Sequence, residues 1–152
     1  MHEVSKLFLV FALHRSGSSA VVGVAGLKDP RMVITFDFLK PYFEMLNDIT
    51  YVFVWRPLNE SIQSLAHRHN ADFAAAQTLL EPYYANLNYH REQLEKENKD
   101  IVDIHFADLP ENPEDFVKNI YLRLNCNINY VDFDVIKEFL DQNLKHFQIN
   151  AR

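Results

Sequence analysis

The 152-residue sequence has a single cysteine, three glycines and six prolines. One cysteine cannot form a disulfide within the chain, and this composition permits a reducing compartment. So few glycines and prolines leave no room for a flexible linker between domains. Since 48% of the residues are hydrophobic, the chain can bury one sizeable core. We therefore expect residues 1–152 to form a single domain.

The sequence also lacks an excess of positive charge and a long hydrophobic run. Its net charge of −6 argues against a nucleic-acid-binding protein, because phosphate backbones require an excess of lysine and arginine. The apolar run at residues 7–13 is much shorter than the about 20 residues of a membrane span, and no signal-peptide cleavage site follows it. We expect a cytoplasmic protein that binds neither nucleic acid nor membranes.

What the chain does contain is an apolar run that leads into a hydroxyl-rich turn. Residues 7–13 are all apolar, as in a strand of a parallel sheet covered on both faces. The loop after such a strand lies at the carboxyl edge of the sheet, where ligands bind. Its backbone N–H groups, hydroxyls and guanidinium would converge on an anion. The pattern predicts a phosphate loop made of Arg15, Ser16, Gly17, Ser18 and Ser19; an ordinary polar connection is the alternative.

This loop lacks the lysine of a Walker motif. That motif requires a lysine directly after its second glycine, but Ser18 follows Gly17, and Ala12 stands where the first glycine belongs. The sequence therefore disfavours an ATPase, a GTPase or a small-molecule kinase.

A second apolar run, residues 51–55, ends in Arg56 and a proline-initiated helix. Pro57 suits the first turn of a helix, where its missing N–H is not needed. Ser64 follows Arg56 by eight residues, about two turns into this helix and on the same side as its start. The segment offers a second anion-binding group after a second strand.

Together the two segments resemble the sulfotransferase family. In that family a loop Pro-[Lys/Arg]-x-Gly-[Thr/Ser]-[Thr/Ser] holds the 5′-phosphosulfate of 3′-phosphoadenosine 5′-phosphosulfate (PAPS). A later Arg-x-Pro, with a serine eight residues after the arginine, holds the 3′-phosphate. Residues 100–113 resemble the family's later strand and turn, so the similarity extends from Leu7 to about Leu124. The matching positions are Arg15, Gly17, Ser18, Ser19, Arg56, Ser64, His67, Asp108, Leu109 and Pro113.

The resemblance implies a P-loop-like sulfotransferase fold, PAPS as the cofactor, and metal-free transfer of a sulfuryl group to a hydroxyl or amine of a small molecule or carbohydrate. Arg15 stands where relatives stabilise the transferring group, a role that suits a fixed cation. A non-catalytic nucleotide-binding module of the same fold is the alternative.

The chain departs from the family at the catalytic base. Phe36 stands where many relatives have the histidine that takes the acceptor proton. Asp37 and His14 are the candidate replacements; the alternative for Asp37 is an N-cap of the helix after it. The interval between Ser19 and Arg56 is also short for the family. We therefore expect a partner subunit of a homo-oligomer, or an acceptor protein, to enclose the cofactor.

Apolar periodicity predicts strands at about 6–13, 32–36, 50–55 and 101–106. It predicts helices near 18–27, 38–47, 58–69, 72–97, 113–124 and 132–145. Such alternation indicates a three-layer α/β/α fold with a mainly parallel sheet. Tyr83, Tyr84 and Tyr89 either wall an acceptor site or pack on the sheet. His67 and His69 point to different sides of a helix, so we expect no metal site there.

Overall fold

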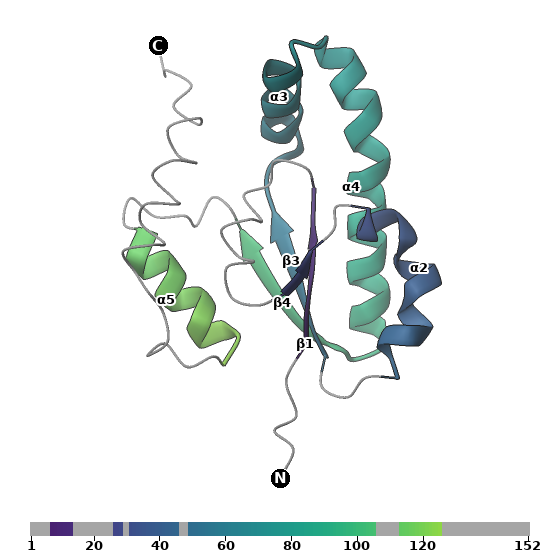
Figure 1. Ribbon diagram of the computed structural model, residues 1–152, viewed down its shortest axis with the longest axis vertical. Coiled ribbons are helices and arrows are strands. Elements are labelled where there is room, and N and C mark those ends of the chain that lie inside the picture. The colour runs from purple at the N-terminus through teal and green to yellow at the C-terminus, as the bar shows by residue number, and fades with distance from the viewer. Residues whose placement is uncertain (1–6, 14–25, 29–30, 46–48, 106–112, 126–152) are drawn as a thin grey trace.

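The computed structural model describes residues 7–13, 26–28, 31–45, 49–105 and 113–125. Within them, four strands form one parallel sheet in the order β2-β1-β3-β4 (Figure 1). The strands are β1 (Leu7–Ala12), β2 (Gly26–Lys28), β3 (Ile49–Trp55) and β4 (Asp100–His105). The helices are α2 (Met32–Phe43), α3 (Leu58–His69), α4 (Phe73–Lys96) and α5 (Pro113–Arg123). The expected α/β architecture with a parallel sheet is confirmed.

Helices cover both faces of this sheet, because alternate residues of the apolar strands point to opposite sides. Figure 1 shows α5 on one side of the strands, and α4 with α2 on the other. The core under α5 consists of Phe8, Val10, Ala12, Val52, Val54, Ile104, Ile120 and Leu124. The core under α2 and α4 consists of Leu9, Phe11, Leu13, Met32, Val33, Phe36, Tyr51, Phe53, Leu87 and Leu94.

Helices α3 and α4 form a hairpin that projects beyond the carboxyl edge of the sheet (Figure 1). Helix α3 ends at Asn70, whose φ of 47° is left-handed, and the N–H of Ala71 donates to the carbonyl of Ala66 at 2.9 Å. This pattern stops the helix and reverses the chain. A small apolar cluster of Ile62, Ala76 and Leu80 joins the two helices. Pro82 lies inside α4 without dividing it.

Most of the predicted elements that fall on described residues are confirmed. The strands predicted at 6–13, 50–55 and 101–106 correspond to β1, β3 and β4. The helices predicted at 58–69, 72–97 and 113–124 correspond to α3, α4 and α5 within one residue at each end. The helix predicted at 132–145 and most of that at 18–27 lie outside the described residues. Residues 26 and 27, the end of the latter, belong to strand β2.

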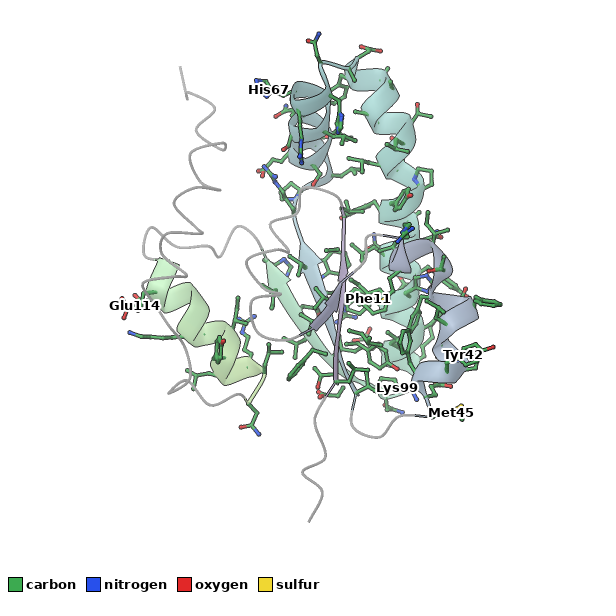
Figure 2. The ribbon with its side chains drawn as sticks, viewed as in Figure 1. Phe11, Tyr42, Met45, His67, Lys99 and Glu114 are labelled. Atoms are coloured by element: carbon green, nitrogen blue, oxygen red, sulfur yellow. The ribbon has the colours of Figure 1, made fainter. Side chains whose placement is uncertain are left out.

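The strand predicted at 32–36 is wrong, because these residues begin helix α2. Met32, Val33 and Phe36 face the core, but Ile34 is 50% exposed and Phe38 is 74% exposed. Apolar residues on both sides of the helix hide its 3.6-residue period. The helix predicted at 38–47 is the second half of α2, which ends at Phe43. Figure 2 shows Tyr42 and Met45 pointing away from the rest of the molecule.

Every helix of the described residues is too short or too polar to span a lipid bilayer. No group of three or more histidine, cysteine, aspartate or glutamate side chains there could hold a metal ion.

Candidate functional site

A pocket of about 230 Å³ opens at the carboxyl ends of β3 and β4. Its described lining is Trp55, Arg56, Pro57, Tyr84 and His105. Trp55 and His105 are the last residues of their strands and are partners in the parallel register. The pocket therefore lies at the edge of the sheet where ligands bind in open α/β folds.

Arg56 lines this pocket and is 8% exposed. It follows the last residue of β3, as predicted. Its Nε donates a hydrogen bond to Oε2 of Glu60 at 3.2 Å, and the Glu60 side chain is 52% exposed. A buried guanidinium requires hydrogen-bonding partners, which explains a carboxylate in the first turn of α3. Glu60 would compete with any anion that approaches Arg56.

The other predicted residues of this segment lie along α3. Ser64 is half-buried, two turns into the helix. His67 is exposed in the last turn, far from Arg56, and its side chain points outward in Figure 2. The prediction passed over Ser61, which is fully buried and whose hydroxyl has no hydrogen-bond partner within the described residues.

The indole of Trp55 is held by a charged network. Its Nε1 donates to Oδ1 of Asp103 at 2.6 Å, and Nη2 of Arg91 donates to Oδ2 of the same carboxylate at 2.8 Å. Arg91 also donates from Nη1 to Oε2 of Glu95 at 2.7 Å. Partial burial alone would raise the pKa of Asp103, but hydrogen bonds from Arg91 and Trp55, with the charges of Arg91 and His105, lower it. The network fixes one wall of the pocket.

Of the three tyrosines predicted as an acceptor wall, one lines the pocket. The ring of Tyr84 meets the indole of Trp55 edge-on, with centroids 6.4 Å apart and an interplanar angle of 80°. Tyr83 is partly buried against the core under α4. Tyr89 is 48% exposed and its ring packs edge-on against His90. Trp55 itself was missed; an indole at the end of a predicted strand, directly before Arg56, was the available signal.

Asp37, a predicted base, lies in the middle of α2. The helix begins at Met32, so the alternative that Asp37 caps a helix is wrong. Its carboxylate, on a 68% exposed side chain, is 3.5 Å from Nδ1 of His90. Nε2 of His90 lies 2.9 Å from the carbonyl of Val33, and since a carbonyl only accepts, this nitrogen carries the proton. Asp37 is not among the described residues that line the pocket.

Phe36, at the position of the family's catalytic histidine, is a core residue. It is 1% exposed, and its ring meets that of Phe11 edge-on with centroids 4.8 Å apart. A side chain at this position therefore points into the core under α2 and α4.

The predicted phosphate loop and the remaining predicted base lie outside the described residues. These are His14, Arg15, Ser16, Gly17, Ser18 and Ser19. The described chain before them ends at the buried Leu13. Ala12 pairs with Val54 of the neighbouring strand, so β1 ends at the level where β3 approaches Arg56.

The described part of the site offers a buried cation, a fixed indole and a second aromatic ring at the carboxyl edge of a parallel sheet. This combination suits an anionic ligand that also has a flat apolar part. No protein-family model, curated protein or solved structure matches the chain. Its function is therefore inferred from the site.

Proposed function

We propose that this protein is a sulfotransferase-like protein, with a P-loop-like fold, that binds PAPS at the carboxyl edge of its sheet. It would transfer the sulfuryl group to a hydroxyl or amine of a small molecule or carbohydrate. The observation that carries the proposal is the position of Arg56: buried, at the end of β3, and lining a pocket.

The arrangement of the strands supports the proposal. Strands β1 and β3 are parallel neighbours, with Ala12 opposite Val54. Strands β1 and β3 therefore end at the same edge of the sheet, and the two segments that resemble the family's phosphate-binding motifs come directly after these strands in the sequence. Two anion-binding groups so arranged suit a nucleotide with phosphates on both its 3′ and 5′ sides.

The proposed reaction is an in-line displacement at sulfur. The acceptor oxygen or nitrogen forms a bond to sulfur while the bond between sulfur and the 5′-phosphate oxygen breaks. Adenosine 3′,5′-bisphosphate leaves, and the acceptor proton passes to a base. Arg15 would stabilise charge on the leaving oxygen, residues 16–19 would bind the 5′ side, and Arg56 with Ser64 would bind the 3′-phosphate. His14 and Asp37 remain the predicted bases.

The second candidate is a nucleotide-binding module without catalysis. The observation that favours it is Phe36, since the residue at the position of the family's base is buried in the core. The carboxylate of Asp37, directly after it, lies 3.5 Å from Nδ1 of His90 on α4. A positioned base contributes about 10²–10⁴-fold in rate, so its loss would leave binding with little turnover.

Isothermal titration with adenosine 3′,5′-bisphosphate tests the binding site. We expect micromolar binding that Arg56→Ala and Ser64→Ala each weaken about tenfold or more, as for loss of a charge-assisted hydrogen bond. Glu60→Gln removes the carboxylate beside Arg56 and is expected to tighten binding. Arg68→Ala, at an exposed arginine of the same helix, is the matched control and is expected to change nothing.

Turnover separates the remaining alternatives. An enzyme releases adenosine 3′,5′-bisphosphate from PAPS when given phenols, amines and sugars, and His14→Gln or Asp37→Asn abolishes release without weakening binding. A binding module binds the nucleotide and releases nothing with any acceptor. A preference for ATP with magnesium over the bisphosphate would reject both and point to a kinase.

A further inference from the structure

We propose that the pocket at the ends of β3 and β4 binds a planar aromatic ring that carries an anionic group, the ring lying against Trp55 and Tyr84. This inference rests on the described lining of the pocket and does not require that the protein transfer sulfuryl groups.

The two aromatic walls have the geometry for holding a ring. Trp55 and Tyr84 stand nearly perpendicular, at 80°. Phe53, two residues before Trp55 on the same face of β3, lies nearly parallel to the indole at 17° with centroids 6.0 Å apart. Phe53 therefore packs against the core side of the indole, and the pocket lies toward the carboxyl edge of the strand. A ring placed there can stack on Trp55 and meet Tyr84 edge-on, the two arrangements that aromatic pairs prefer.

The indole cannot turn away from this position without breaking hydrogen bonds. Its N–H is used by Asp103, and that carboxylate is itself held by Arg91 from α4. The N–H of the indole is thus turned toward Asp103 and Arg91 rather than used to bind a ligand. The tryptophan offers the pocket a fixed apolar surface, which lowers the entropy cost of binding.

The size and the polar groups of the pocket define the ligand further. An apolar cavity of about 150 Å³ holds benzene, so about 230 Å³ suits one ring or a fused pair of rings. Arg56 and His105 are the basic side chains of the described lining, and both can donate to an anion. Phosphate, sulfate or carboxylate on the ring would be recognised by the guanidinium.

Two sources can supply this chemistry: the base and phosphate of a nucleotide, or an aryl acid or ester. Trp55 is the only tryptophan in the chain, so its intrinsic fluorescence reports on the pocket directly. Phenyl phosphate and adenosine 3′,5′-bisphosphate are titrated separately, with cyclohexyl phosphate as the non-aromatic control. We expect at least one aromatic ligand to change the emission of Trp55 at concentrations at which cyclohexyl phosphate does not.

Tyr84→Leu removes one wall and is expected to weaken that binding about 2- to 10-fold, as for loss of an aromatic pair. Tyr42→Leu, at a tyrosine of α2 that is 63% exposed, is the matched control and is expected to bind as the unaltered protein does. Far-ultraviolet circular dichroism checks that both variants fold. The proposal is overturned if no aromatic anion changes the emission, if cyclohexyl phosphate acts equally, or if the two tyrosine variants bind alike.

The two proposals can fail separately. In the first case, the bisphosphate binds through Arg56 and Ser64, but its binding neither alters Trp55 emission nor weakens in Tyr84→Leu. If phenyl phosphate also leaves the emission unchanged, the proposed aromatic pocket is rejected and nucleotide binding stands. If phenyl phosphate binds in a manner dependent on Tyr84 while the bisphosphate does not bind, the aromatic pocket stands and the sulfotransferase-like function is rejected.

Discussion

The indole nitrogen of Trp55 lies 2.6 Å from a carboxylate oxygen of Asp103, although these residues are not opposite each other in the sheet. In the register, Trp55 pairs with His105, and Asp103 pairs with Phe53. The hydrogen bond is therefore diagonal, between neighbouring strands on the face that α4 covers. It joins the last residue of β3 to the Arg91 side chain of α4 through one carboxylate.

Asp103→Ala is expected to lower the free energy of unfolding by about 2 kcal/mol, because it leaves the indole N–H and the guanidinium of Arg91 without their acceptor. The loss is no larger because the Asp103 side chain is 27% exposed, so water screens its charge. Urea unfolding measures the change. Glu92→Ala, at an exposed position of α4, is the control. Equal stabilities of the two variants would show that the network contributes nothing.

The Asp103 carboxylate also makes the free energy of unfolding depend on pH in the acidic range. The pKa of Asp103 is lower in the folded protein than in the unfolded chain, so its contribution is fully present above the unfolded value of about 3.9. It is lost as the pH falls through the folded value. We expect the stability difference between the unaltered protein and Asp103→Asn to shrink from pH 6 to pH 2. Urea midpoints across this range test it, and a constant difference would contradict the prediction.

His90→Ala is expected to cost about 2–4 kcal/mol, because it opens a cavity in the core and removes the hydrogen bond to the Val33 carbonyl. His90 is 4% exposed, and its ring meets that of Phe36 edge-on with centroids 5.2 Å apart. Asp37→Asn is the comparison. Its side chain is 68% exposed, so we expect a change below about 0.5 kcal/mol. Thermal and urea unfolding of both variants measure this contrast; a loss in Asp37→Asn as large as in His90→Ala would refute it.

Tyr51→Phe is expected to matter mainly in alkali. Burial, with smaller contributions from the charges of Glu44 and Glu97, raises the pKa of Tyr51 to about 12. A raised folded pKa gives stability that is fully present below the unfolded value of about 10 and is lost as the pH rises through the folded value. Between pH 10 and 12 the unaltered protein therefore loses stability through this group, and Tyr51→Phe does not. Absorbance of phenolate and urea midpoints provide the two measurements.

The strands and helices around the site could be predicted wherever the sequence had one unambiguous pattern. Residues 7–13 and 51–55 are continuous apolar runs, and these become the central strands β1 and β3. Strand β2 has only three residues, too few for a pattern to appear. Helix α2 was misread because Ile34 and Phe38 are apolar but exposed, so the segment lacks a polar face.

The site could be predicted only where a residue's place follows from its neighbours in the sequence. Arg56 comes directly after the apolar run at residues 51–55, so its position at the end of β3 could be predicted. The bond from Trp55 to Asp103 joins residues 48 positions apart and depends on the register of β3 with β4. The contacts of Tyr84 with Trp55 and of Arg91 with Asp103 depend further on how α4 packs on that face of the sheet. No local pattern encodes these relationships.

The length of α4 gives its two ends different local stabilities. Toward its C-terminus, Leu87 and Leu94 are part of the large core under α2 and α4. Toward its N-terminus, Ala76 and Leu80 belong to the small cluster shared with α3. We expect amide hydrogens at the tip of the hairpin to exchange with solvent faster than those near Leu94. Tyr84 and Arg56 lie where the hairpin of α3 and α4 joins the sheet. A ligand that contacts both residues would therefore couple the opening of the hairpin tip to that of the core under α2 and α4.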